Sequence, residues 1–450
     1  MNKKYFGTDG IRGLANKYPM DAETALKVGK AAGAYFTNSD EKHRVVIGKD
    51  TRLSGYLIEP SLTAGFVSMG MDVILVGPVP TPALSMLTRS LRADLGVMIS
   101  ASHNAYHDNG IKFFDKKGRK LSDKIEKELE DLIDSDLNKN LAASDKLGKA
   151  RRLDDAQGRY IEYVKSTFPK NKRLDGLKVV IDCANGAAYK LAPDILWELG
   201  AEIIPIAVTP NGFNINDDCG STHTNKLQNA VIENKADIGI ALDGDADRLI
   251  VCDENGSLID GDQIIAAIAT YWNEHNRLKG GGVVTTVMSN MGLEKYLESI
   301  GVNLERTNVG DRYVIEKMLS GGFNLGGEQS GHLIFNDFTT TGDGTLAALQ
   351  TLAILVEKQL PASEILNVFT PYPQILKNIK FDKKNNPLQK NYVQTTIQNA
   401  HDVLGDNGRV LIRESGTEPL IRVMIEGNDL DKINSIMDSI LKSIEIAQGE

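Results

Sequence analysis

The segment Val179-Val-Ile-Asp-Cys-Ala-Asn-Gly-Ala187 joins a short β-branched run to a turn of small polar residues, and a helical pattern follows from Pro193 to Leu199. The same succession begins at Val45-Val-Ile-Gly-Lys-Asp-Thr-Arg-Leu-Ser-Gly55 and at Val283-Val-Thr-Thr-Val-Met-Ser-Asn-Met-Gly292. Short, nearly continuous apolar runs are typical of strands buried on both faces of a sheet. Strands that alternate with helices, such as the helical stretch Met20 to Phe36, predict α/β domains, here three similar ones.

The chain after Pro371-Tyr-Pro373 has a different pattern. It reads as a strand, a helix, two strands and a final amphipathic helix, which predicts a smaller α+β unit. We expect that helix over Pro387–Leu404, the strands over Arg409–Arg413 and Pro419–Glu426, and the last helix from Leu430. The charged stretch from Asp115 to Gln157 keeps helical spacing at Ile125, Leu129, Leu132 and Ile133, so we expect a surface helix and a linker there.

Bulk composition narrows the function classes. A chain of 450 residues is longer than one hydrophobic core supports, which predicts several domains. The formal net charge of −9 argues against a general binder of nucleic acid or anionic membranes, whereas an anionic small substrate needs only a local cluster of donors. The polar N-terminus does not resemble a signal peptide, no stretch is long enough to span a bilayer, and the three cysteines have no paired spacing. We therefore expect a cytoplasmic protein.

The first motif that carries chemistry is Gly96-Val-Met-Ile-Ser-Ala-Ser-His-Asn104. A strand-like run ends there in small polar residues, and functional loops often lie at the carboxyl ends of strands. Ser102 is a candidate nucleophile, and His103 and Lys112 are candidates to handle protons or phosphate charge. The alternative is an ordinary cap or turn. No Gly-x-Ser-x-Gly elbow surrounds the serine, which disfavours a hydrolase.

The second motif is Ile238-Gly-Ile-Ala-Leu-Asp-Gly-Asp-Ala-Asp-Arg248. Asp243, Asp245 and Asp247 converge only if a cation offsets their repulsion, and hard oxygen ligands suit Mg²⁺ or Ca²⁺. A calcium loop would require glycine where Arg248 stands and a helix where a β-like run follows. The pattern therefore favours a Mg²⁺ site between two strands over a solvated acidic turn.

The third motif, Gly326-Gly-Glu-Gln-Ser-Gly-His332, combines close backbone approach with acceptors and donors. Glu328 and Ser330 suit a vicinal diol or an amino-alcohol, and His332 is a candidate for proton transfer because an imidazole ordinarily titrates near neutral pH. A polar turn at the end of a helix is an equally good interpretation of this motif alone.

The fourth motif is Arg413-Glu-Ser-Gly-Thr-Glu-Pro-Leu-Ile-Arg422. The backbone amides around Ser415, Gly416 and Thr417 are suited to an anion-binding nest. Arg413 and Arg422 add guanidinium groups that bind phosphate. The alternative is a hairpin turn with a surface arginine at each end.

Together the four motifs predict phosphoryl transfer on a sugar phosphate. The sequence resembles the α-D-phosphohexomutase superfamily along essentially its whole length. The resemblance rests on Tyr5-Phe-Gly-Thr-Asp-Gly-Ile-Arg-Gly13, Ser100-Ala-Ser-His-Asn104, Asp243-Gly-Asp-Ala-Asp-Arg248, Gly327-Glu-Gln-Ser-Gly-His332 and Arg413-Glu-Ser-Gly-Thr-Glu-Pro419. The opening motif and Gln329 favour the branch that acts on glucosamine phosphates over phosphomannomutase/phosphoglucomutase relatives. Lys49 departs from the arginine that is common there.

The resemblance implies a role for each site residue. Ser102 would be a phosphoserine, and one Mg²⁺ per subunit would be held by Ser102, Asp243, Asp245 and Asp247. Glu328, Ser330 and Arg248 would bind substrate, and Arg413, Ser415, Gly416, Thr417 and Arg422 would hold the phosphate that does not react. Arg12, Lys112 and His332, with His103 beside the serine, would assist proton transfer.

The resemblance also implies a fold and a reaction. Three similar mixed α/β domains and a smaller C-terminal α+β domain would surround a central cleft. Their expected bounds are 1–157 with the phosphoserine loop, 158–256 with the metal, 257–369 with the sugar loop and 370–450 with the phosphate nest. Glucosamine 6-phosphate and glucosamine 1-phosphate would interconvert through a 1,6-bisphosphate, which is the intermediate or activator, and so supply peptidoglycan precursors. We expect a monomer or homodimer with a small sugar phosphate as its partner, and no nucleic acid or membrane. An inactive sugar-phosphate sensor is the alternative outside the enzymes.

Overall fold

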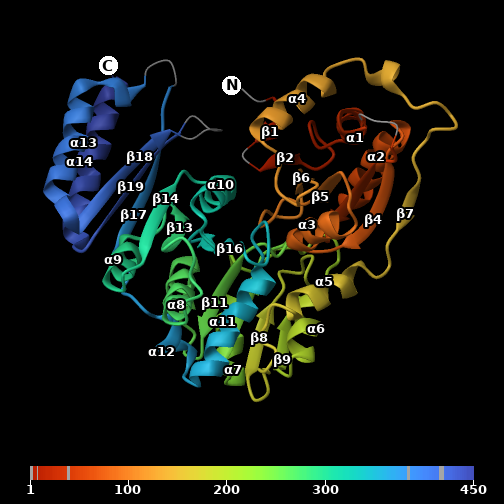
Figure 1. Cartoon of the computed structure of the whole chain (residues 1–450). Helices are drawn as coiled ribbons and strands as arrows, with labels where there is room; N and C mark the ends of the chain where they lie inside the picture. The colour runs from red at the N-terminus through yellow and green to blue at the C-terminus, as the bar shows by residue number, and fades with distance from the viewer. Residues whose placement is uncertain (1–3, 8, 38–40, 383–385, 415–419, 450) are drawn as a thin grey trace.

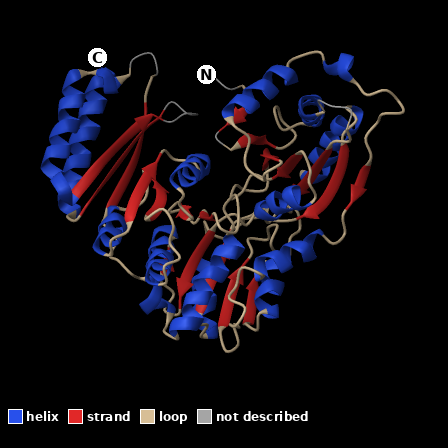
Figure 2. Ribbon diagram, viewed as in Figure 1, coloured by secondary structure: helices blue, strands red, loops and turns tan. Residues whose placement is uncertain are grey.

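The computed structural model describes residues 4–7, 9–37, 41–382, 386–414 and 420–449. Within this part of the chain, four sheets follow one another along an arc, with the first and the last sheet at its two ends (Figure 1). Helices cover the sheets of all four units (Figure 2). In the described residues, no helix is long and apolar enough to cross a membrane.

The first sheet has seven strands in the order β1-β2-β6-β5-β3-β4-β7. Strands β5, β3, β4 and β7 are parallel, and β6 runs antiparallel between β5 and β2. Helices α1, α2 and α4 share a core with one face, and α3 packs on the other. The strands are β1 (Phe6–Gly7), β2 (Gly10–Leu14), β3 (Arg44–Lys49), β4 (Asp72–Pro78), β5 (Leu95–Ile99), β6 (Asp108–Asp115) and β7 (Ala150–Arg152), and the helices are α1 (Ala22–Phe36), α2 (Gly55–Ser68), α3 (Thr81–Ser90), α4 (Asp123–Ile133) and the 3₁₀ turn η1 (Leu137–Asn140).

The second and third sheets repeat the mixed α/β design with fewer strands. Their orders are β12-β11-β10-β8-β9 and β14-β13-β15-β16, each with parallel strands and antiparallel neighbours at one side. One continuous hydrophobic core joins them to the α3 side of the first sheet. The elements of the second sheet are α5 (Ala156–Lys165), β8 (Lys178–Asp182), α6 (Leu191–Glu198), β9 (Glu202–Ile206), α7 (Asn225–Asn234), β10 (Ile238–Leu242), β11 (Leu249–Asp253) and β12 (Leu258–Ile259). Those of the third are α8 (Gly261–Glu274), β13 (Gly282–Thr286), α9 (Met291–Ser299), β14 (Asn303–Thr307), α10 (Asp311–Gly321), β15 (Leu325–Gly327), β16 (Leu333–Phe335), α11 (Gly344–Lys358) and α12 (Ala362–Leu366).

The C-terminal unit is a three-stranded antiparallel sheet with two helices and a core of its own. Its elements are β17 (Gln374–Lys380), η2 (Pro387–Gln389), α13 (Asn391–Leu404), η3 (Gly405–Asn407), β18 (Gly408–Glu414), β19 (Leu420–Gly427) and α14 (Leu430–Gly449). The expected helix from Pro387 starts four residues late, at Asn391. Pro387–Gln389 forms a separate 3₁₀ turn, in which the Asn386 side chain accepts a hydrogen bond from the Leu388 nitrogen.

The predicted fold class is confirmed. The three β-branched runs form β3, β8 and β13, each buried along most or all of its length. The expected surface helix is α4, whose Leu129 and Ile133 are buried while much of its opposite face is exposed. Three loops carry the site: the loop after β5, the loop between β10 and β11, and the loop between β15 and β16. Their positions relative to one another are set because their three sheets share one hydrophobic core.

We predict that Gly65→Ala destabilises the first unit. Helices α1 and α2 cross at Gly29 and Gly65, and a methyl group on Gly65 would lie 2.6 Å from the Leu26 carbonyl oxygen. Overpacking against backbone costs about 1–3 kcal/mol, which a urea or thermal unfolding transition will show. Gly158→Ala in α5 is the control, because no atom lies within 4 Å of its new methyl group. Equal unfolding free energies for the two variants would contradict the tight crossing.

Candidate active site

The Ser102 loop begins where β5 ends. Ser102 has a positive φ of 53°, and its backbone nitrogen donates to Ser100 Oγ at 2.9 Å. This left-handed conformation is uncommon for a residue with a side chain. The Ser102 hydroxyl donates to Asp243 Oδ2 at 2.6 Å, and the residue is only 2% exposed. The structure thus brings the predicted nucleophile onto the predicted metal loop.

Two side chains from loops of the first and second units hold the Ser102 loop by its carbonyl groups. The fully buried Arg52 donates from Nη2 to the Ser102 oxygen at 2.9 Å and to the Asn104 oxygen at 2.8 Å. Asn216 donates from Nδ2 to the same two oxygens at 2.8 and 2.9 Å. A methyl group on Gly244 would lie 2.6 Å from the Ser102 oxygen and 2.8 Å from Asn216 Nδ2, so the metal loop needs glycine there.

The three aspartates converge as expected. Asp243, Asp245 and Asp247 are buried, and one oxygen from each lies within 4.8 Å of the others. Burial, together with the charges of Asp247 and Asp245, raises the pKa of Asp243 well above its usual value. Asp245 Oδ2 accepts from Thr81 at 2.6 Å and from Lys112 at 2.8 Å.

This cluster fits a divalent cation. Asp245 Oδ1 and Asp247 Oδ1 are buried and accept no hydrogen bond. Buried carboxylate oxygens without a donor are costly unless a cation satisfies them. The loop also runs between strands β10 and β11, as the sequence predicted, and oxygen-only donors suit Mg²⁺.

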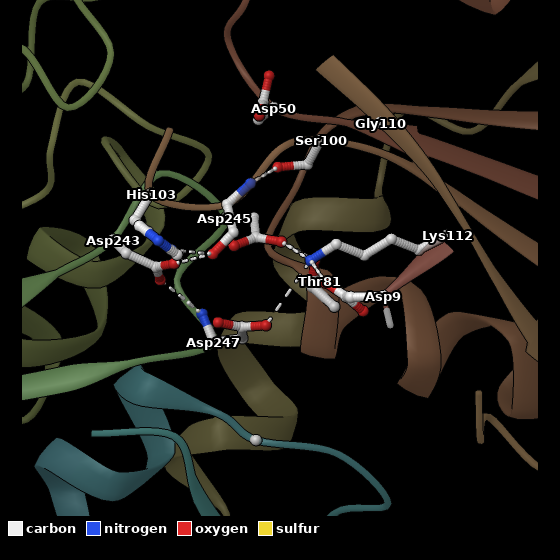
Figure 3. A network of polar contacts seen from close by, with 12 residues as sticks. Asp9, Asp50, Thr81, Ser100, His103, Gly110, Lys112, Asp243, Asp245 and Asp247 are labelled. Carbon is white, nitrogen blue, oxygen red and sulfur yellow. Dashed lines mark hydrogen bonds and ion pairs between the residues drawn. The ribbon is translucent and has the colours of Figure 1, made fainter. Parts of the chain in front are cut away.

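Lys112 reaches the aspartates from the side opposite His103 and Asp243 (Figure 3). Lys112 Nζ lies 2.8 Å from Asp245, 3.2 Å from Asp9 and 3.9 Å from Asp247. Burial opposes its charge, but these carboxylates outweigh burial and raise the pKa of Lys112. Arg12 pairs with Asp9 at 2.5 Å. Burial would raise the pKa of Asp9, but Lys112, Lys120 and Arg12 hold that pKa well below its usual range.

The two site histidines differ in charge. Burial, with the nearby Arg248 and Arg12, lowers the pKa of His103 to about 4, so it is neutral. Its Nδ1 lies 3.3 Å from Ser102 Oγ. His332 lies between Asp247 at 3.6 Å and Asp311 at 3.3 Å. These carboxylates outweigh burial and raise the pKa of His332 to about 10. The Gly342 nitrogen also lies 3.2 Å from its Nε2, which fits only a neutral ring, but the flanking carboxylates favour the charged form.

The predicted sugar loop forms the turn between β15 and β16, not the end of a helix. Glu328 accepts from the Gly310 nitrogen at 3.2 Å, and Ser330 is exposed. The Gln329 amide donates a hydrogen bond to Asp260 at 3.0 Å, directly before α8. Arg248 carries a buried, unpartnered Nε, and the nearby Asp243 and Asp247 charges outweigh burial and raise its pKa.

Strands β18 and β19, which carry the two arginines of the predicted phosphate nest, belong to the unit at the far end of the arc from β5 (Figure 1). Arg413 on β18 and Arg422 on β19 are direct cross-strand partners. Burial, together with Arg422, lowers the pKa of Arg413, and Arg422 Nε is buried without a partner. Ser415, Gly416 and Thr417 lie outside the described residues.

Sequence reasoning missed several residues that shape this site. Arg52 stood inside a quoted motif, and Asp9 inside the opening motif, so both had a signal in the sequence. Thr81, Lys120, Asn216 and Asp311 had none, because each reaches the site from a segment without an unusual pattern.

Four family models match the chain in order. Phosphoglucomutase/phosphomannomutase alpha/beta/alpha domains I, II and III match residues 3–140, 158–256 and 260–372, and the C-terminal domain matches residues 376–443. These four domains in this order, together with a buried serine that contacts an aspartate cluster, define the class of protein. The chain is a phosphohexomutase, which is an isomerase. Among curated relatives, phosphoglucosamine mutase from Parvibaculum lavamentivorans is 60% identical over 99% of both chains. The enzyme of that name from Paramagnetospirillum magneticum is 59% identical over 100% of both. The chain therefore belongs to the phosphoglucosamine mutase family.

Solved structures share the fold. A phosphoglucomutase/phosphomannomutase family protein from Burkholderia thailandensis has a TM-score of 0.82 at 23% identity, covering 98% of this chain and 97% of its own. N-acetylphosphoglucosamine mutase from Aspergillus fumigatus, solved with GlcNAc-6P and magnesium, has a TM-score of 0.68 at 18% identity, covering 99% of this chain and 96% of its own.

We predict that Asn216→Ala slows turnover without changing the fold. The variant loses two of the hydrogen bonds that hold the Ser102 loop, and misplacement of a reacting group by about 1 Å can cost up to about 100-fold in rate. Steady-state kinetics should show a lower kcat at a nearly constant KM. Asn234→Ala is the control, because its amide donates to the Ala230 carbonyl of a surface helix. A kcat equal to that of Asn234→Ala would refute the role of Asn216.

Proposed function

We propose that the enzyme interconverts glucosamine 6-phosphate and glucosamine 1-phosphate through a phosphorylated Ser102. The observation that carries this proposal is the 2.6 Å contact between the Ser102 hydroxyl and a buried aspartate cluster with unsatisfied oxygens. The Aspergillus fumigatus enzyme solved with a sugar phosphate and magnesium supports the choice of ligands. We further propose four domains, 1–157, 158–256, 257–369 and 370–450, in a cytoplasmic monomer or homodimer.

The first half-reaction moves the phosphoryl group from Ser102 to the sugar. The bond between phosphorus and Ser102 Oγ breaks as a bond to the free sugar hydroxyl forms, which yields glucosamine 1,6-bisphosphate. The sugar hydroxyl loses one proton and Ser102 Oγ gains one, and His103, whose Nδ1 lies 3.3 Å from Ser102 Oγ, is placed to relay a proton to the serine oxygen. After the sugar turns end for end, the other phosphoryl group returns to Ser102 by the same steps in reverse.

The charged groups around Ser102 stabilise the transfer. Asp243, Asp245, Asp247 and the Ser102 phosphate would hold one Mg²⁺, which would draw negative charge from the transferring phosphoryl group. Lys112, Arg12 and His332 present fixed positive charge on the other side of the aspartates. Arg248 carries its charge beside Asp243 and Asp247, where it would meet the substrate.

Other residues hold the substrate while it reacts. Glu328 and Ser330 would bind sugar hydroxyls or the amine, and Arg413 and Arg422, with Ser415, Gly416 and Thr417, would hold the phosphate that does not react. This phosphate must be bound through its charge, because the same nest binds the 1-phosphate and the 6-phosphate of the sugar in turn.

We expect Ser102→Ala to lose turnover of glucosamine 6-phosphate by about 10³-fold or more, since the covalent route is gone. A coupled assay of glucosamine 1-phosphate measures it, and Ser135→Ala on the exposed surface is the control. Intact mass should show one phosphate on active wild type and none on the variant. Full turnover by Ser102→Ala would exclude the phosphoserine route, and higher kcat/KM on mannose or glucose 6-phosphate would exclude the assigned sugar.

Removal of divalent metal should abolish turnover, and added Mg²⁺ should restore it. Asp245→Asn should need more Mg²⁺, because one of the three carboxylate ligands is lost. Calorimetric titration of Mg²⁺ into the phosphorylated enzyme reports binding independently of activity. Undiminished turnover in excess chelator, or unchanged Mg²⁺ affinity in Asp245→Asn, would count against this site.

A further inference from the structure

A closed ring of alternating charges runs through the site and includes residues to which no role has yet been given. Three carboxylates and three cations take part, from all three sheets that share the core. The successive contacts are Asp247–Lys112 at 3.9 Å, Lys112–Asp9 at 3.2 Å, Asp9–Lys120 at 2.5 Å, Lys120–Asp311 at 2.7 Å, Asp311–His332 at 3.3 Å and His332–Asp247 at 3.6 Å. The ring therefore contains Lys112 and His332 of the proposed mechanism, and Lys120 closes it on the side away from the metal loop.

Lys120 is enclosed although it stands in a charged surface segment. Its side chain is only 10% exposed, and its Nζ contacts one oxygen each of Asp9 and Asp311. A lysine is rarely buried unless it is paired, and two short ion pairs on one amino group account for its burial. Its two partners belong to different units: Asp9 lies between β1 and β2, and Asp311 begins α10.

Each partner of Lys120 also holds a cation of the active site. Asp9 binds Lys112 through Oδ2 while it binds Lys120 through Oδ1. Asp311 Oδ2 is shared between Lys120 and His332. Without Lys120, Asp9 would attract Lys112 more strongly and compete with Asp245, which Lys112 contacts at 2.8 Å. Asp311, without its ion pair to Lys120, would likewise attract His332 more strongly and draw it away from Asp247.

The same bridge fixes the start of α10, on which the sugar loop depends. The backbone N–H of Gly310, directly before α10, donates a hydrogen bond to Glu328. The next residue after Asp311 is Arg312, which pairs with Asp123 and, at 3.0 Å, with Glu126 of α4. The first turn of α10 is thus tied to the first unit by Lys120 and by Arg312.

We propose that Lys120 is a positioning residue for the mutase reaction: it holds Lys112 through Asp9, and His332 through Asp311, at the distances that phosphoryl transfer requires. This inference rests on the roles proposed above for Lys112 and His332. In the described part of the chain, Lys120 itself forms no hydrogen bond or ion pair with Ser102 or with the aspartate cluster.

The test compares Lys120→Ala, Lys120→Arg and the control Lys124→Ala in the full-length phosphorylated enzyme. Lys124 lies on the same segment with its side chain 84% exposed. We expect Lys120→Ala to lower kcat by about 10- to 100-fold, with KM for glucosamine 6-phosphate nearly unchanged, because the phosphate anchor is remote. Lys120→Arg should keep more of the activity. Ethylammonium chloride should restore part of kcat in Lys120→Ala and leave Lys124→Ala unaffected, because the small cation takes the place of the lost amino group.

A purely structural role predicts another result: a lower unfolding temperature, a smaller folded fraction and no rescue by the amine. That result, or a kcat within twofold of Lys124→Ala, would overturn the inference. If Lys120→Ala does not fold, Lys120→Met and Asp311→Asn, alone and combined, serve as a double-mutant cycle, and additive effects on kcat would overturn it. A failed Lys120 test leaves the proposed function intact when Ser102→Ala and Lys112→Met are still inactive. If Lys112→Met keeps full kcat, the proposed role of Lys112 fails with it.

Discussion

The repulsion among three buried carboxylates is the constraint on which the rest of this structure depends. Asp243, Asp245 and Asp247 lie within one short turn between two strands. Among the described residues, their own unit supplies backbone donors to Asp243 and the charge of Arg248. The compensating groups come from elsewhere: the Ser102 hydroxyl, Thr81 and Lys112 from the first unit, and His332 from the third. Buried charges are tolerated only when they are paired in this way. The shared hydrophobic core of the first three sheets therefore does more than stabilise the fold, because it fixes the distance between the acids and their cations.

The backbone is strained in the two loops that bring Ser102 and the three aspartates together. Ser102 and Ala246 both have positive φ, at 53° and 54°, and each belongs to one of two loops that touch at Gly244. A conformation of this kind costs on the order of 1–3 kcal/mol and persists only where its surroundings hold it. Arg52 and Asn216 do so at Ser102 by donating hydrogen bonds to two carbonyl groups of the loop, those of Ser102 and Asn104. The hydroxyl of Ser102 is consequently aimed at Asp243 by backbone contacts, so its direction does not depend on a bound substrate.

The sequence predicts a site residue when a pattern of neighbouring residues marks it. The strands β3, β8 and β13 and the loops that carry Ser102 and the three aspartates follow from short apolar runs and adjacent polar clusters, and all were predicted. Lys120 was not, because in Lys116-Lys-Gly-Arg-Lys120 nothing separates an enclosed lysine from its solvated neighbours. Asn216 and Asp311 are likewise ordinary until the fold brings them to the site. Gln329 shows the opposite case: it helped to identify the family, yet its amide is engaged by Asp260 at the start of α8. The site residues Ser415, Gly416 and Thr417 stay predictions.

The distribution of charge separates the capture of the substrate from the transfer of its phosphoryl group. Around Ser102, the negative charges of Asp9, Asp245, Asp247 and Asp311 offset most of the positive charge of Arg12, Lys112, Lys120, Arg248 and His332, so this region has little net charge with which to attract a phosphate. A divalent cation and a dianionic phosphoryl group, added together, preserve that balance. Arg413 and Arg422 are different, because two guanidinium groups on neighbouring strands repel each other until an anion lies between them. They belong to a unit with its own core, so the phosphate that does not react can be anchored there by charge alone. An anchor of that kind accepts the 1-phosphate and the 6-phosphate equally, as a sugar that turns end for end requires.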